Sequence, residues 1–519
     1  MVSACITRVN NATREANAVR SDSQPGSREG QAGPWVVAER FVVVMKPGNS
    51  GGAKGPQFQD NARSSKGPKM IGQDSTPGPT NSQKVQKLQA ALHTKAKESP
   101  KFRFYALHDK VYRADVLHVA YEQCRKNGGA PGVDGQSFAD IEAYGVEKWL
   151  GELAEEVRTK RYEPQAVRRV WIAKADGGKR PLGIPTIKDR VVQTAVLLIL
   201  GPIFEADLPA EQHAYRAGKS ALEAVQEVHR LICYGHSEVV DADLSDYFGS
   251  IPHAELMQCV ARRVSDSRVL ALVKAWLVAP VEEQDERGNT QRTTRNKDEG
   301  RGTQQGSPIS PLLANLYMRR FILGWKQLGH ETQFQARIVN YADDFVILCR
   351  RGADQALLAM RSMMQRLKLT VNEKKTRVCK LPESFDFLGY TIGPYWSWVQ
   401  RRMVLSTRPS AKSRKRIKAA IRRTTRRSRV LLDVKTIVKE LNRKLRGWAN
   451  YFCRGPVSEA YRDVDRHTQN RLRQWLGGKH KQSGLRHDLY PNELLQGKLG
   501  LLQLTSLPRN VPWAKGCGQ

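Results

Sequence analysis

The stretch of sequence that decides the fold is Arg337-Ile338-Val339-Asn340-Tyr341-Ala342-Asp343-Asp344-Phe345-Val346-Ile347-Leu348. Two apolar runs flank the polar tetrapeptide Tyr341 to Asp344, and this pattern predicts a β-hairpin with an acidic pair at its tight turn. Adjacent carboxylates repel each other unless a cation lies between them and a third acid. A lone Asp-Asp pair is usually a solvated turn, so the interpretation depends on a further acid reaching the same point.

A second predicted strand supplies that acid. Residues 237–244 read Ser-Glu-Val-Val-Asp-Ala-Asp-Leu, a strand pattern that ends in acids. If the two strands meet, Asp243, Asp343 and Asp344 form a three-carboxylate site for two Mg²⁺ ions, which favour oxygen ligands and substrate phosphates. Two such ions about 3.5–4 Å apart activate a 3′-hydroxyl and stabilise the leaving pyrophosphate during in-line displacement. The pattern therefore predicts nucleotidyl transfer.

The charge of the chain points to a polyanionic partner. Its 519 residues carry a formal charge of +34 and an isoelectric point near 10, which suits nucleic acid or an anionic membrane surface. The longest apolar stretch, residues 191–204, contains Gln193, Thr194, Gly201 and Pro202 and is shorter than the roughly 20 residues of a membrane span. We therefore expect a buried core helix there and no membrane partner.

Cysteine usage indicates a reducing compartment. The eight cysteines are scattered and include no C-x-x-C pair, which argues against a zinc module and against a disulfide framework. No apolar secretory segment follows Met1. These features favour the cytoplasm, and a bacterial cytoplasm over an organelle.

Composition changes along the chain suggest its organisation. Residues 1–95 are rich in Gly, Ser, Pro, Gln and Asn, and we expect this low-complexity extension to be disordered. Helical spacing of apolar residues begins near residue 101, and residues 183–235 also have a largely helical pattern. A strand at 166–172 leads into a Gly177-Gly178 turn. Helices mixed with antiparallel hairpins predict an α+β fold.

Residues 408–481 form a strongly basic helical region. They include 23 Lys or Arg and five Asp or Glu, a net charge of +18. A run of charge is normally a solvated helix face, but this density favours contact with nucleic acid. The candidate contacts are Arg414, Lys415, Arg416, Arg422, Arg423, Arg426, Arg427, Arg443, Lys444 and Arg446.

Further candidates surround the predicted carboxylate site. Phe248 lies five residues after Asp243, where an aromatic ring could pack under the incoming sugar and exclude a 2′-hydroxyl, or could simply belong to the core. The Gly/Pro-punctuated loop around Gln305 could line a nucleotide pocket. Lys174 and Arg180 flank the glycine turn, where basic residues suit a triphosphate.

Together these pieces resemble the reverse transcriptase domain of group II intron-encoded proteins. Asp243 falls at the first metal-binding aspartate of that family, Phe248 at the position that gates against ribonucleotides, and Tyr341 to Asp344 at its Y-x-D-D box. The other matching blocks are residues 180–186, 189–193, 212–220, 305–311, 372–376 (which include Lys374) and 387–390, and residues 445–452 are similar to the core of the maturase, or thumb, domain.

The resemblance implies a right-hand polymerase followed by a basic helical domain. Fingers and the start of the palm would occupy 96–240, and a palm with an antiparallel sheet 241–400. The thumb/maturase domain would occupy 408–481 and a tail 482–519. It implies an RNA-directed DNA polymerase that uses two Mg²⁺ ions, with Lys174, Arg180, Phe248, Gln305 and Lys374 at the substrate. Its partners would be intron RNA, an RNA template with DNA primer, dNTPs and target DNA.

Some positions depart from the family pattern. Gly249 and Pro252 stand where many relatives have acids, Gln304 replaces a common proline, and the charged loop at 282–300 is longer than usual. No H-N-H pattern or cysteine pair follows the maturase region, so we expect the family's optional endonuclease domain to be absent. Two alternatives stay open: an RNA-binding maturase whose polymerase fold is inert, and a related reverse transcriptase in defence, retron synthesis or CRISPR adaptation.

Overall fold

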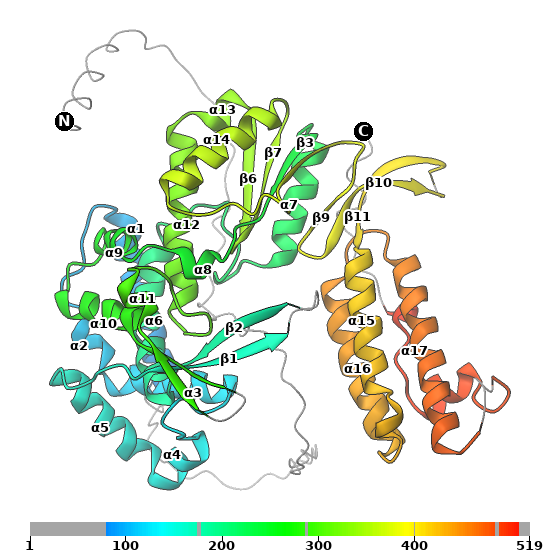
Figure 1. The fold of residues 1–519 in the computed structure, drawn as a ribbon, viewed down its shortest axis with the longest axis horizontal. Helices are drawn as coiled ribbons and strands as arrows, with labels where there is room; N and C mark the ends of the chain where they lie inside the picture. Colours follow the sequence, from blue (N-terminus) through cyan, green and yellow to red (C-terminus); the bar gives the residue numbers. More distant parts are fainter. Residues whose placement is uncertain (1–78, 174–177, 286–288, 399, 483–486, 508–519) are drawn as a thin grey trace, which may run out of the picture. The chain divides into compact units, whose positions relative to one another are not determined.

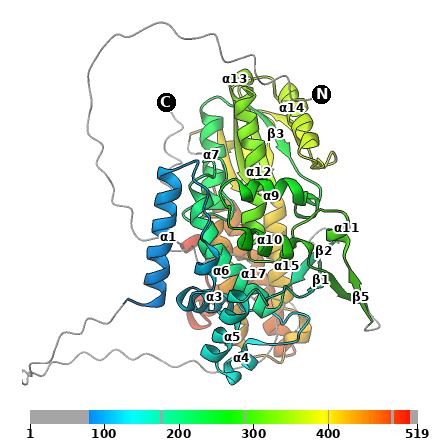
Figure 2. The ribbon, with the colours of Figure 1, turned by 90° about the vertical axis from the view of Figure 1, so that its left-hand side faces the viewer.

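The computed structural model describes residues 79–173, 178–285, 289–398, 400–482 and 487–507, all within the unit Val36–Gln519. Its first part is a helical layer, shown in blue and cyan in Figure 1, in which α1 packs on α3 and α6 (Figure 2). These helices are α1 (Asn81–Glu98), α2 (His108–Val111), α3 (Ala114–Asn127), α4 (Phe138–Tyr144), α5 (Val146–Arg158) and α6 (Ile187–Glu205).

Helix α1 occupies the last part of the segment 1–95 that the sequence predicted to be disordered. Thr80 caps the helix together with Gln83, and Val85, Leu92 and Ala96 form a narrow buried stripe. Gln89 fixes the helix to its neighbour, because its Nε2 donates to the carbonyl of Leu198 in α6 at 3.0 Å. Ordered structure therefore begins well before residue 95, while residues 1–78 lie outside the described part.

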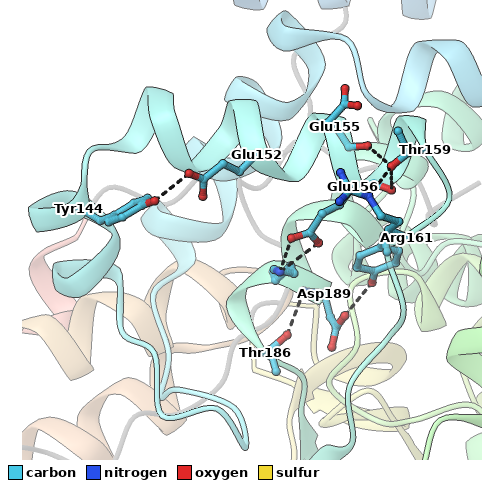
Figure 3. Close-up of polar contacts among 10 residues, drawn as sticks. Tyr144, Glu152, Glu155, Glu156, Thr159, Arg161, Thr186 and Asp189 are labelled. Carbon is cyan, nitrogen blue, oxygen red and sulfur yellow. Dashed lines mark hydrogen bonds and ion pairs between the residues drawn. The ribbon is translucent and has the colours of Figure 1, made fainter.

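Helix α6 is the buried core helix that the sequence predicted. Its N-terminus is held by a polar network around Asp189 (Figure 3). The Tyr162 hydroxyl donates to Asp189 at 2.7 Å, Trp276 Nε1 donates to that hydroxyl at 3.0 Å, and the amide of Asp189 donates to Thr186 Oγ1 at 3.1 Å. None of the helices in the described part of the chain combines the length and apolar character of a membrane span.

The first sheet has the order β2-β1-β4-β5. The predicted strand is confirmed as β1 (Val167–Ala173), which pairs antiparallel with β2 (Lys179–Ile184), while residues 174–177 of the predicted turn lie outside the described residues. The charged segment predicted to be a loop at 282–300 instead contains secondary structure. Strand β4 (Val281–Gln284) pairs parallel with β1 and antiparallel with β5 (Thr290–Thr293), and the short helix α11 (Arg295–Asp298) follows.

A central four-stranded sheet, of order β6-β7-β3-β8, is antiparallel throughout. Its strands are β3 (Glu238–Ala242), β6 (Ala336–Tyr341), β7 (Asp344–Cys349) and β8 (Arg377–Lys380). Helices α7 and α14 pack on these strands, and α12 packs on α9. The helices of this part are α7 (Ala221–Cys233), α8 (Tyr247–Ser250), α9 (His253–Ala261), α10 (Ser267–Val278), α12 (Ser310–Gln327), α13 (His330–Gln333) and α14 (Ala353–Arg366).

A three-stranded antiparallel sheet, of order β11-β10-β9, follows along the chain. It consists of β9 (Phe385–Phe387), β10 (Tyr390–Ser397) and β11 (Arg402–Pro409). The predicted start of the helical region at residue 408 is therefore too early, because that residue still pairs with Thr391 in the sheet.

The C-terminal helical domain contains three long helices, of which α15 packs on both others (Figure 1). Ile421, Leu441, Leu445 and Leu472 lie in its apolar core. The core also includes Leu495, Leu501 and Leu504, so part of the predicted tail 482–519 belongs to this domain. Its elements are α15 (Ala411–Thr424), η1 (Arg427–Arg429), α16 (Val434–Tyr451), α17 (Ser458–Lys479), η2 (Leu494–Lys498) and η3 (Leu504–Ser506).

Candidate active site

The hairpin predicted at Tyr341–Asp344 is confirmed, and it lies at one end of the central sheet. Strands β6 and β7 pair through Tyr341 opposite Asp344. Ala342 takes a left-handed conformation at the turn, with φ of 59°, and Asn340 Nδ2 donates to its carbonyl at 2.8 Å. The local turn is thus held by a buried side chain beneath it.

The register of β3 brings the third carboxylate to the same end. Ala242 lies opposite Phe345 in the antiparallel pair of β3 and β7. One residue further along each strand, Asp243 and Asp344 are therefore neighbours. Sequence segments about a hundred residues apart meet here, as the sequence predicted.

Asp243 is held by the segment that leads into β8. Its Oδ2 accepts from Asn372 Nδ2 at 2.9 Å and from Lys375 Nζ at 3.1 Å. The backbone of Asn372 also donates to the Asp243 carbonyl at 2.8 Å. The structure therefore brings Lys375 to this carboxylate, whereas the sequence singled out Lys374.

Burial first, and repulsion between carboxylates second, raises the pKa of both Asp343 and Asp344. Removal from water raises the pKa of Asp343, and Asp243 raises it further against the opposing charges of Arg180 and Lys375. The pKa of Asp344 is raised to about 7, first by removal from water and then by Asp343, Asp243 and Asp241. More than a third of the Asp344 surface is exposed, so solvent screens its charge, and its repulsion from the other carboxylates lowers the stability of the fold only weakly.

This donor set fits a divalent cation in its chemistry. Hard cations favour carboxylate oxygens, and a cation would relieve the repulsion. The side chains as they stand do not surround one point, since no group of three His, Cys, Asp or Glu among the described residues is arranged to hold a metal ion. Asp243 is turned to Asn372 and Lys375, so it would exchange those partners for a metal.

Two predicted substrate residues meet beside this group. Arg180 Nε, from β2, donates to Gln305 Oε1 at 2.7 Å. The backbones also approach closely, because the amide of Gly183 donates to the carbonyl of Gln305 at 2.6 Å. Gly306 allows this contact: its φ is 112°, and a Cβ there would lie 2.2 Å from the Gly183 carbonyl oxygen. Lys174 lies outside the described residues.

Phe248 is buried, in agreement with a core role at least. It lies in α8, with its ring 5.7 Å from that of Tyr247, and its carbonyl accepts from the amide of Thr303 at 2.7 Å. Gly249 is confined by its neighbour, since a Cβ there would lie 2.1 Å from Asp246 Oδ2. Because this contact is with the end of a side chain, an acid at position 249 would require Asp246 to turn away.

The predicted nucleic-acid contacts differ in their surroundings. Exposed residues include Lys415 and Arg416 in α15 and Arg443 and Arg446 in α16, together with Arg422, Arg423, Arg426 and Arg427. Arg414, Lys415, Lys418 and Arg422 line an open groove that also includes Ala411 and Asp463. Lys444 differs, because it is partly buried and pairs with Glu440 at 2.6 Å.

Three residues at the site were missed by sequence reasoning. Asp241 lies in β3, two residues before Asp243, which directly follows the strand, and this spacing places both side chains on the same face. Lys375 contacts Asp243, and no pattern distinguished it from Lys374. Tyr215, in the block 212–220, has its pKa raised to about 12 by removal from water, then by Asp343 and Tyr341. Its segment lies beside the acidic hairpin, because the amide of His213 donates to the Asn340 carbonyl at 2.9 Å.

Comparison with known proteins agrees with this geometry. The family described as "Reverse transcriptase (RNA-dependent DNA polymerase)" matches residues 172–392, and the one described as "Group II intron, maturase-specific domain" matches residues 414–491. The first match contains all three carboxylates, and the second contains most of the basic helices.

Individual relatives support both matches. The chain is 30% identical over 369 residues to the protein YkfC of Escherichia coli K12, covering 64% of this chain and 94% of that relative. It is 26% identical over 352 residues to the group II intron-encoded protein LtrA of Lactococcus lactis subsp. cremoris, covering 56% of this chain and 57% of LtrA. A shorter match, 31% over 111 residues, is to the mitochondrial nuclear intron maturase 2 of Arabidopsis thaliana, covering 21% of this chain and 15% of that relative.

The antiparallel sheet with its acidic hairpin, together with the first match, defines the class: the chain carries a reverse transcriptase domain of mixed α+β fold. With the maturase-specific segment after it, the chain belongs to the family of group II intron-encoded reverse transcriptases with a maturase domain. The resemblance stated from the sequence is thereby confirmed.

Proposed function

We propose that this reverse transcriptase extends a DNA primer on an RNA template with dNTPs, using two Mg²⁺ ions bound by Asp243, Asp343 and Asp344. The observation that carries the proposal is the gathering of these carboxylates, with raised pKa values at Asp343 and Asp344. Bound Mg²⁺ would supply activation of the primer 3′-hydroxyl and stabilisation of the leaving pyrophosphate. In this proposal Asp241 adds negative charge without being a ligand.

The side chains around the carboxylates would hold the nucleotide. Arg180 would bind the triphosphate while its Nε–Gln305 hydrogen bond keeps both side chains oriented. Lys174 and Lys374 would add positive charge for the phosphates, and Phe248 would limit space at the sugar 2′ position. Lys375 would orient Asp243 before metal binds.

The C-terminal helical domain, which would correspond to the thumb, would bind intron RNA and the template–primer duplex through phosphates. The cationic groove of Arg414, Lys415, Lys418 and Arg422 supports this, because Asp463 is the one acid among the described residues that line it. Such binding weakens steeply as salt rises, and folded RNA is read mainly through shape and backbone. RNA binding here would promote splicing, and binding of target DNA would serve intron mobility.

We propose a bacterial cytoplasmic setting, in line with the relatives from E. coli and L. lactis.

The decisive experiment is primer extension on an RNA template with Mg²⁺ and dNTPs. Asp343→Asn keeps the side-chain shape and should reduce cDNA synthesis by about a hundred-fold or more. Asp354→Asn is the matched control: Asp354 is exposed and pairs with Lys380 at 2.9 Å, and Lys380 lies opposite Glu238, at the end of β3 that is remote from Asp243. It should leave extension unchanged.

The inert maturase makes the opposite prediction. In that case neither wild type nor Asp343→Asn would produce cDNA, while salt-sensitive binding to intron RNA would persist in both. Splicing that continues in Asp343→Asn, with cDNA from wild type alone, would separate the two activities.

A further inference from the structure

The outer half of the β10–β11 hairpin is a two-stranded ribbon. Strand β9 pairs only with Tyr390–Ile392, whereas β10 and β11 stay paired as far as Ser397 and Arg402 (Figure 1). An isolated two-stranded ribbon is marginally stable in water. Side chains displayed on it therefore contribute little to a core and more to contacts with other molecules.

One face of this ribbon carries exposed large apolar side chains. Trp396 lies opposite Met403, and their exposed fractions are 43% and 56%. Trp398 follows at the tip and is 80% exposed. The two tryptophan rings lie 6.2 Å apart and nearly perpendicular, at 84°. Adjacent exposed aromatic side chains of this size mark a binding surface more often than chance.

The other face and the tip are basic. Arg402 lies opposite Ser397, and Arg401 precedes it at the tip. Arg408 lies over the ring of Tyr395, with its Cζ 5.7 Å from the centroid. The sequence from 387 to 432 contains 13 Lys or Arg and no Asp or Glu. The ribbon therefore favours an anionic occupant, and a second copy of a chain with charge +34 would be repelled.

We propose that the outer half of the β10–β11 hairpin binds an unpaired segment of RNA. Bases would stack on Trp396 and Trp398, and the RNA backbone would pass around the tip, where its phosphates would lie at Arg401 and, on the other face, at Arg402. Aromatic side chains beside cations are the arrangement that holds single strands without sequence preference. Duplex RNA hides its base faces within the helix, so it offers only phosphates to this surface. The inference rests on the proposed function only in taking RNA as the ligand.

The test measures binding of the full chain to a labelled, unstructured RNA of about a dozen nucleotides by fluorescence anisotropy, without Mg²⁺ or dNTPs. The double variant Trp396→Ala/Trp398→Ala should bind it about ten-fold or more weakly, since each stacked base contributes strongly. Trp396→Phe/Trp398→Phe should restore most of the affinity. Tyr105→Ala, which removes another aromatic side chain that is 72% exposed, should have no effect.

Salt and duplex controls identify the contact. The loss in the double alanine variant should be the same at all salt concentrations, because stacking releases no counterions, whereas Arg401→Ala/Arg402→Ala should reduce the salt slope. In Trp396→Ala/Trp398→Ala the affinity for duplex RNA should equal that of wild type. Equal loss for duplex and unpaired RNA, unchanged binding to unpaired RNA, or an altered oligomeric state with RNA binding intact would overturn the proposal. Failure of cDNA synthesis in wild type would leave this measurement unaffected, so the two proposals fail separately.

Discussion

Arg180 Nε donates to Gln305 Oε1 at 2.7 Å, although the two residues are 125 positions apart in the chain. Arg180 belongs to the second strand of the first sheet, and Gln305 to the loop before α12. Each was a separate candidate in the sequence, and their contact joins the two segments beside the carboxylates.

Removing Arg180 should weaken dNTP binding. A hydrogen bond from a charged donor contributes about 1.5–3 kcal/mol, so Arg180→Ala should raise KM for dNTP by about ten-fold or more in steady-state primer extension. Arg292→Ala is the control on the same sheet, because Arg292 is exposed and its ion pair with Glu282 is long, at 3.9 Å. If both variants keep the wild-type KM, Arg180 has no role at the nucleotide.

Gly306→Ala should separate the segment that carries Gln305 from β2, which carries Arg180. The new Cβ would meet the Gly183 carbonyl at 2.2 Å in a conformation that already disfavours L side chains. We expect primer extension to fall at least as far as in Arg180→Ala, with a lower Tm. The control is Gly151→Ala in α5, where a new Cβ would have open space, with no neighbouring atom of the described residues within 4 Å. That change should raise Tm slightly and leave extension intact.

The sequence predicted the central features of the site because strong local patterns carry them. Short apolar runs flank Tyr341–Asp344 and are buried along most of their length, so the polar tetrapeptide between them marks the turn. The choice of Lys374 had no such pattern behind it: adjacent residues after a turn point differently, and composition does not reveal which of them reaches Asp243.

Other elements lacked such patterns. Strand β4 reads Val281-Glu282-Glu283-Gln284 and owes its place to pairing with β1, which no local signal announces. Helix α1 has a narrow apolar stripe in a polar segment, so composition suggested disorder. Leu495, Leu501 and Leu504 follow no regular period, and tertiary packing alone places them in the helical core.

Phe248→Val should relax sugar selection if the ring limits space at the 2′ position. We expect the ratio of kcat/KM for rNTP to that for dNTP to rise by about ten-fold, measured on one template. Tyr247→Phe is the control: the Tyr247 hydroxyl donates to the Ala314 carbonyl at 2.6 Å, so its loss should lower stability without changing the ratio. A lower Tm with an unchanged ratio in Phe248→Val would assign Phe248 to the core alone.

Lys375→Ala should make the protein respond more strongly to Mg²⁺. Lys375 Nζ lies 3.1 Å from Asp243, and without it the carboxylates repel each other with less compensation. The rise in Tm on adding Mg²⁺ should therefore be larger in Lys375→Ala than in wild type. Lys374→Ala, the adjacent change, should behave as wild type. An identical Mg²⁺ response in all three proteins would show that Lys375 does not substitute for a metal.

Glu440→Gln should reveal a pH-dependent contribution to stability in the helical domain. Partial burial alone would raise the pKa of Glu440, but hydrogen bonds from Arg429 and Lys444 outweigh it and lower the pKa to about 2. The folded state therefore binds this proton less readily than the unfolded chain, so the contribution is complete above about pH 4.5 and disappears as pH falls toward 2. At pH 7 the free energy of unfolding, measured with urea, should be about 1–3 kcal/mol lower in the variant, and the difference from wild type should shrink between pH 5 and pH 3.

The control is Glu459→Gln, a change at an exposed residue 3.6 Å from Arg414, which should show little loss of stability at any pH. A constant difference across this range would mean that the loss in Glu440→Gln arises from packing rather than from the charge of Glu440.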